Sequence, residues 1–74
     1  MEYPVIDMAA TGSRLRSLIR ESGRSVSEVA ALLGLSNIST LYKWLRGDTL
    51  PAIDNMLALS ILLGVSINDF LAVK

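Results

Sequence analysis

The chain has 74 residues, 51% of them hydrophobic, and its seven Lys and Arg residues balance seven Asp and Glu residues, for a net charge of zero. This length fits one small domain, and the mean hydropathy of +0.48 indicates a compact core with apolar surface left over for self-association. The absence of cysteine and histidine excludes disulfides, thiolate or imidazole metal ligands and the usual proton shuttle at neutral pH.

The carboxylates do not form a catalytic arrangement. They are scattered, and each has a local explanation as a helix cap, a turn residue or a solvated side chain. The seven are Glu2, Asp7, Glu21, Glu28, Asp48, Asp54 and Asp69. Because the common catalytic groups are missing, the sequence predicts no enzyme activity, no cofactor, no metal site and no small-molecule ligand.

The zero net charge conceals an uneven distribution. From Thr11 to Gly47 there are six cations and two carboxylates, a surplus of four positive charges, and the rest of the chain has a surplus of four negative charges. The six cations are Arg14, Arg16, Arg20, Arg24, Lys43 and Arg46. A low net charge argues against a nucleic-acid partner, since phosphate neutralisation supplies most non-specific affinity for DNA. The positive surplus between Thr11 and Gly47 answers this argument in part.

The first ten residues contain Pro4 and no helical period, which predicts an N-terminal arm at residues 1–10 before a folded domain at residues 11–74. The arm either lies on the domain or frays, and the sequence favours neither. It lacks the cations of a secretory signal, and no apolar run is long enough to cross a bilayer. We therefore expect a cytoplasmic protein without membrane contact.

Thr11 is placed to cap a first helix that ends before Gly23, with Leu15, Leu18 and Ile19 on its inner face. The outer face carries three arginines that are either solvated or in contact with a nucleic-acid backbone, and the pattern leaves both open. They are Arg14, Arg16 and Arg20.

Two short helices joined by a tight turn are predicted next. Ser25 and Glu28 have the spacing of a capping box, and Gly34 tolerates the left-handed backbone that ends the first of these helices. Either Ser36 or Asn37 can cap the second helix. Its inner stripe is formed by Ile38, Leu41, Trp44 and Leu45.

The outward side of this second helix carries side chains that donate hydrogen bonds and no carboxylate. They are Ser39, Thr40, Tyr42, Lys43 and Arg46. In a helix-turn-helix, the second helix lies in the major groove of DNA, where short polar side chains meet base edges and cations meet phosphates. The competing interpretation is the solvated face of an ordinary amphipathic helix, and the order of the two helices favours DNA.

Residues 48–51 are predicted to form a loop before a further helix at residues 53–63. Its core side is predicted to hold Ile53, Met56, Leu57, Leu59, Ser60 and Leu63. Ser66 and Asp69 have the spacing of a second capping box, which fits a last helix near the C-terminus.

Several short groups of residues carry a resemblance to a known family. They are Val29-Ala30, Leu33-Gly34, Ser39-Thr40-Leu41, Arg46-Gly47 and Leu50-Pro51. With them, the segment from about residue 11 to residue 73 resembles the lambda-repressor-like, Cro-type helix-turn-helix domains of the XRE family. The resemblance implies an all-α, compact five-helix bundle that binds double-stranded DNA as a homodimer and serves as a repressor-like transcriptional regulator.

The chain departs from the commoner family pattern in three places. Val26 stands where many members have a Gln that reaches the DNA backbone. The turn before the second motif helix is one residue longer, which leaves open whether Asn37 or Ile38 faces the groove. Ile19 and Leu45 replace an Arg and a Glu that can form an ion pair in relatives, so we expect these two apolar side chains to meet.

In this interpretation the DNA-binding residues divide by role. Those expected at base edges are Asn37, Ser39, Thr40 and Lys43, and those expected at phosphates are Tyr42 and Arg46. Two other functions stay open, namely a protein–protein interaction module on the same fold and an antitoxin or phage-type switch protein.

Overall fold

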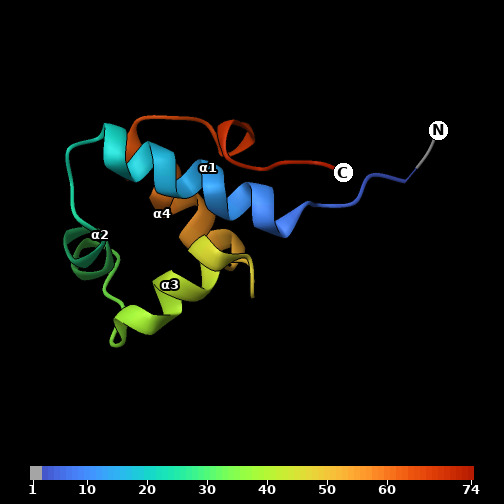
Figure 1. The fold of residues 1–74 in the computed structure, drawn as a ribbon. Helices are drawn as coiled ribbons and strands as arrows, with labels where there is room; N and C mark the ends of the chain where they lie inside the picture. Colours follow the sequence, from blue (N-terminus) through green and yellow to red (C-terminus); the bar gives the residue numbers. More distant parts are fainter. Residues whose placement is uncertain (1–2) are drawn as a thin grey trace.

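The computed structural model describes residues 3–74 as a bundle of four α-helices and one short 3-10 helix (Figure 1). The elements are α1 (Met8–Glu21), α2 (Val26–Leu32), α3 (Ile38–Arg46), α4 (Ile53–Leu63) and the 3-10 helix η1 (Ile67–Asp69). The only β-type pairing among these residues is one isolated bridge, so the all-α prediction is confirmed. The fifth helix is a single 3-10 turn, in which Ser66 N–H donates to Asp69 Oδ2 at 2.9 Å.

Helix α1 begins at Met8 and not at Thr11, so the predicted N-cap was wrong. Asp7 is the cap, because its Oδ1 accepts a hydrogen bond from Ala10 N–H at 3.0 Å. Thr11 is buried, and its Oγ1 accepts a hydrogen bond from Ala72 N–H at 2.9 Å. The hydroxyl group therefore satisfies a buried amide from the other end of the chain, where an unpaired N–H would be costly.

Residues 5–7 of the predicted arm pair with the C-terminal residues. Asp7 N–H donates to Ala72 O at 2.8 Å, and Lys74 N–H donates to Val5 O at 2.9 Å. This part of the arm therefore lies on the domain, next to the start of α1 (Figure 1). The first two residues of the arm lie outside the described part of the chain.

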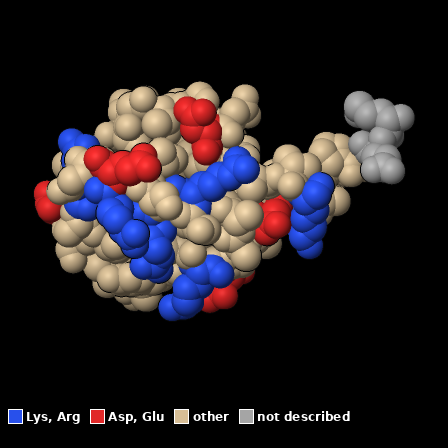
Figure 2. All heavy atoms as spheres, turned by 45° about the horizontal axis from the view of Figure 1, so that its top comes forward, with Lys and Arg blue, Asp and Glu red and all other residues tan. Residues whose placement is uncertain are grey.

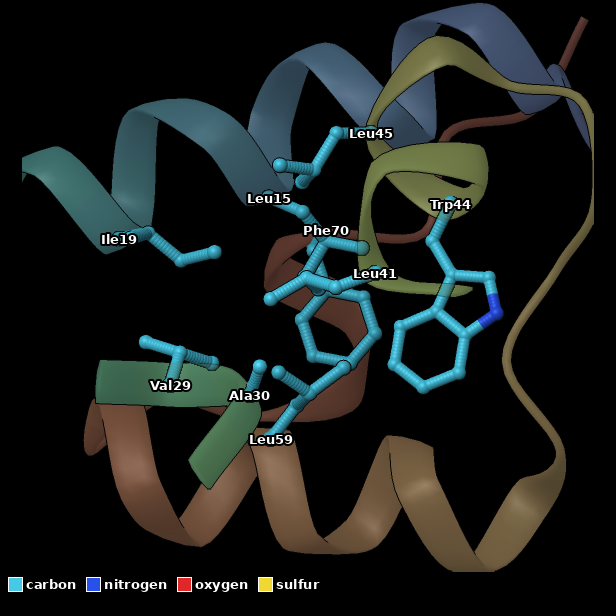
Figure 3. Close-up of a cluster of buried hydrophobic side chains, with 9 residues drawn as sticks. All are labelled: Leu15, Ile19, Val29, Ala30, Leu41, Trp44, Leu45, Leu59 and Phe70. Atoms are coloured by element: carbon cyan, nitrogen blue, oxygen red, sulfur yellow. The ribbon is translucent and has the colours of Figure 1, made fainter. Parts of the chain in front are cut away.

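One buried cluster joins the helices (Figure 3). It contains Leu15, Ile19, Val29, Ala30, Leu41, Trp44, Leu45, Leu59 and Phe70, each at most 5% exposed. The indole of Trp44 extends from α3 toward α4, and the predicted inner stripe is confirmed for Leu41, Trp44 and Leu45. Ile38 was wrongly placed in that stripe, because it lies in the first turn of α3 and is 37% exposed. Ile19 and Leu45 are both buried in this cluster, and the direct contact between their side chains stays a prediction.

Helix α4 differs from the prediction in the face that it turns to the core. Leu59 and Ser60 are buried as expected, but Ile53 and Leu57 are 71% and 55% exposed. Ile61 is 73% exposed, and these three apolar residues, spaced by four, form one exposed line that we call the α4 stripe. Since most residues of this helix are apolar, its periodicity does not identify the inner face.

The backbones of α1 and α3 approach each other closely at two glycines. A Cβ atom on Gly12 would lie 2.6 Å from the carbonyl oxygen of Trp44, and closer still to that of Leu45. Gly47 ends α3 with a φ of +80°, and a Cβ atom there would lie 2.7 Å from the Cα atom of Ala9. The position of α3 on α1 therefore depends on residues without side chains.

Gly12→Ala is expected to destabilise the fold, although alanine is the better helix former. The added methyl group would meet backbone carbonyl oxygens, which cannot rotate away, so we expect a net loss of about 2 kcal/mol after a helix-propensity gain of about 1 kcal/mol. Thermal unfolding followed by circular dichroism measures the change, with Ser13→Ala at the exposed neighbouring position as the control. A Gly12→Ala variant as stable as the wild type would contradict the close approach of the two helices.

Candidate nucleic-acid interface

The first motif helix, α2, begins with the capping box that the sequence predicts. Ser25 Oγ accepts a hydrogen bond from Glu28 N–H, and Glu28 Oε1 accepts one from Ser25 N–H, both at 3.1 Å. Val29 and Ala30 on this helix are buried in the core cluster. Helix α2 is thus fixed at its start by the cap and along its inner face by packing, and it lies against α3.

Asn37 caps the second motif helix, α3, which settles the choice between Ser36 and Asn37. Its Oδ1 accepts a hydrogen bond from Ser39 N–H at 2.9 Å. The side-chain NH2 group of Asn37 stays available as a donor. Asn37 and Ile38 are both exposed at the start of the helix, so burial does not decide which of them faces the groove.

Helix α3 separates its apolar side chains from its polar ones. Leu41, Trp44 and Leu45 are at most 5% exposed. On the other side, the exposed members of the predicted site are Ser39, Tyr42, Lys43 and Arg46, and Thr40 is half-buried. With Asn37 at the helix start, the structure brings all six predicted residues together on one helix, and none of them is a carboxylate.

Arg46 has a partner that the sequence analysis missed. Its Nε donates to Asp48 Oδ2 at 3.0 Å, and the two side chains are 57% and 54% exposed. The left-handed backbone at Gly47 brings Asp48 back over the end of α3, where its N–H donates to Lys43 O at 2.9 Å. A glycine followed by an acidic residue directly after a terminal arginine is the signal that could have indicated this pair.

Two other arginines bind backbone carbonyl groups far away in the sequence. Arg14 Nη1 donates to Leu71 O and Arg24 Nη1 donates to Leu62 O, both at 3.2 Å. Arg14 is therefore one of the groups that hold the C-terminal segment on α1. On the face shown in Figure 2, most of the basic side chains lie across the rounded body of the molecule with acidic side chains beside them, and one lies on the projecting part.

None of the α-helices between residues 3 and 74 has the length and hydropathy of a membrane span.

Solved structures with the same fold include the restriction-modification controller protein C.AhdI from Aeromonas hydrophila. It is 30% identical to this chain, with a TM-score of 0.77 over 86% of this chain and 96% of that one.

Two further solved structures share this architecture. The clp gene regulator ClgR from C. glutamicum is 25% identical, with a TM-score of 0.74 over 85% of this chain and 80% of that one. The DNA-binding domain of BldD is 21% identical, with a TM-score of 0.73 over 88% of this chain and 93% of that one. This similarity supports the fold and carries no argument about function.

No curated protein sequence matches the chain. A family model described as helix-turn-helix matches residues 15–70, which include both motif helices and most of the chain. The resemblance inferred from the sequence is thereby confirmed, and the chain belongs to the XRE-type helix-turn-helix family of DNA-binding regulators.

Proposed function

We propose that the chain is a repressor-like transcriptional regulator that binds a specific double-stranded DNA sequence as a homodimer, with α3 in the major groove. One observation carries the proposal: the second motif helix buries its apolar face and exposes hydrogen-bond donors without a carboxylate. Such a helix suits the major groove, where each base pair presents a distinct pattern of donors and acceptors. The controller and regulator proteins of the same fold support a regulatory role.

The six residues on α3 divide by their position along the helix. Asn37, Ser39, Thr40 and Lys43 occupy its start and middle and contact base edges, whereas Tyr42 and Arg46 contact phosphates. Asn37 uses its NH2 group for this contact, since its carbonyl oxygen already caps the helix. Tyr42 is 37% exposed, so its ring packs partly on the bundle while its hydroxyl group reaches outward.

Lys43→Ala and Arg46→Ala are expected to weaken DNA binding in different ways. Loss of Lys43 should cost roughly 1–3 kcal/mol on the preferred site and relax the preference at one base pair, because lysine donates to guanine acceptors. Loss of Arg46 should weaken binding to all duplexes and make the dependence on salt shallower by about one unit. Fluorescence anisotropy on the selected site and on random duplexes, at several salt concentrations, measures both effects.

The same anisotropy titrations can also show that α3 does not recognise the DNA sequence. Both side chains are exposed, so the thermal midpoints of the two variants should stay close to that of the wild type. If both folded variants kept the full affinity and the full sequence preference, α3 would not read the DNA.

Asp48→Asn provides a matched change of opposite sign beside Arg46. Removing this carboxylate leaves the Arg46 guanidinium without its charged partner at 3.0 Å. We expect binding to random duplexes to strengthen, and the salt dependence to become steeper, because more positive charge then faces the phosphates. Unchanged binding in the same anisotropy titration would indicate that Arg46 lies away from the DNA.

The homodimer part of the proposal rests on the α4 stripe. Ile53, Leu57 and Ile61 expose a line of apolar side chains on one face of one helix. A second copy of the chain offers the same apolar face, and two-fold pairing of identical surfaces is the commonest form of oligomer. Dimerisation also provides two copies of α3 for two half-sites on DNA, which compensates for the small contact area of one copy.

Leu57→Lys is expected to convert a dimer into a monomer, because it places a charge in the centre of an apolar interface. Val5→Lys is the matched control, since Val5 lies in the arm and is exposed to almost the same extent, 54% against 55%. Sedimentation velocity at micromolar concentration should give a dimer for the wild type and the control, and a monomer for Leu57→Lys. A wild-type chain that is monomeric both free and on DNA would remove the dimer from the proposal.

A protein-interaction module on the same fold is the alternative, favoured by the zero net charge and by the exposed α4 stripe. Retention on random duplex DNA at low salt separates the two functions. A DNA-binding chain is retained and elutes as the salt concentration rises, whereas a protein-only module flows through. An antitoxin or a phage-type switch protein would also be retained and would differ from the regulator in its partner.

A further inference from the structure

A surface hollow of about 220 Å³ lies between the C-terminal half of α1 and the start of α2. It is lined by Arg16, Ile19, Arg20, Arg24, Ser25 and Val26. Three of the six lining residues are arginines and none is acidic. We call this feature the arginine hollow.

The arginines of the hollow have no acidic partners among residues 3–74. The ion pair between Arg46 and Asp48 is the only one among residues 3–74, so no carboxylate of that range lies within 4 Å of these guanidinium groups. The Glu28 carboxylate, which lies beside the hollow at Ser25, is held by the capping box. Three like charges are thus gathered with few compensating contacts, an arrangement that costs stability in the free protein.

The hydrogen bonds of the hollow leave most of its donors available. Arg24 uses one nitrogen for Leu62 O, and within residues 3–74 the guanidinium groups of Arg16 and Arg20 make no hydrogen bond. Arg16 and Arg20 are one turn apart, at i and i+4, so their side chains emerge from the same face of α1. Two neighbouring guanidinium groups can therefore reach one ligand together.

The hollow borders the two motif helices. Gly12 on α1 lies against the carbonyl groups at the end of α3. Arg16 follows Gly12 by four residues, about one helical turn, so it emerges close to the same face of α1. On the other side, Val26 is the first residue of α2, which packs on α3. The arginine hollow therefore lies along the flank of the helix-turn-helix and is separate from the exposed face of α3.

We propose that the arginine hollow binds a phosphodiester group of the DNA backbone beside the groove that α3 enters, an inference that rests on the proposed function. Guanidinium groups match phosphate oxygens with paired hydrogen bonds, and Ile19 and Val26 add apolar side chains to the lining of the hollow. Arg16 and Arg20 hold the phosphate, and Arg24, already bound to α4, adds charge. The contact is independent of base sequence and positions α3 on the duplex.

The test compares Arg16→Gln and Arg20→Gln with Arg14→Gln. The control removes the same charge from the same helix, but at a side chain that binds Leu71 O outside the hollow. Affinity for random duplexes is measured as a function of salt concentration, together with the thermal midpoint of each variant. We expect each hollow variant to lose roughly tenfold in affinity. The slope of log affinity against log salt concentration should become shallower by about 0.9, and Arg14→Gln should change this slope much less. Arg20→Lys should restore most of the slope, because it restores the charge.

Each other outcome overturns the inference in a distinct way. If the wild type binds duplexes and the two hollow variants match it, the hollow does not contact the backbone, and the proposed function stands. If Arg14→Gln loses as much slope as the hollow variants, only the overall charge matters. If the hollow variants match the wild type on duplexes while millimolar inorganic phosphate raises the thermal midpoint of the wild type but not of Arg20→Gln, the hollow binds a small free anion and not the DNA backbone. If the wild type binds no duplex at low salt, the proposed function and the inference fail together.

Discussion

The orientation of α3 depends on the close backbone contact between α1 and α3. At Gly12 no side chain separates α1 from the carbonyl oxygens of Trp44 and Leu45. The spacing is therefore set by backbone atoms, and α3 cannot rotate about its axis without moving these carbonyl groups. The side chains on its far face keep a fixed direction relative to the bundle, and such preorganisation lowers the entropy that binding costs.

The helix caps show which contacts sequence analysis can predict. The capping box of Ser25 and Glu28 was predictable because both partners lie within three residues of each other. The cap at Thr11 was mispredicted because its hydroxyl group binds Ala72 N–H, 61 residues away, and Asp7 takes the capping position instead. Local spacing identifies local hydrogen bonds, and it does not show when a distant amide competes for the same oxygen.

Helices α3 and α4 differ in how far their buried faces can be predicted from the sequence. On α3, apolar and polar residues alternate with the helical period, so the burial of Leu41, Trp44 and Leu45 followed from the sequence, whereas Ile38 in the first turn is exposed. On α4 most positions are apolar, and only packing against the rest of the bundle decides that Leu59 is buried and that Leu57 is exposed. The Arg46–Asp48 pair escaped prediction because it depends on the backbone conformation at Gly47.

The zero net charge of the chain does not oppose DNA binding, because screening limits the distance over which charges act. At physiological salt, interactions between exposed charges fade over about 8 Å, whereas the molecule measures 40 × 22 × 20 Å. A carboxylate on the far side therefore has little effect on a phosphate beside α1 or α3. The attraction of each cation for phosphate depends instead on whether a carboxylate lies next to that cation. Arg46 shares its charge with Asp48, and the arginines of the hollow meet no such partner within residues 3–74. In the proposed complex, the arginines of α1 therefore add to the backbone attraction of Arg46 and Tyr42, and Asn37, Ser39, Thr40 and Lys43 remain for the base edges.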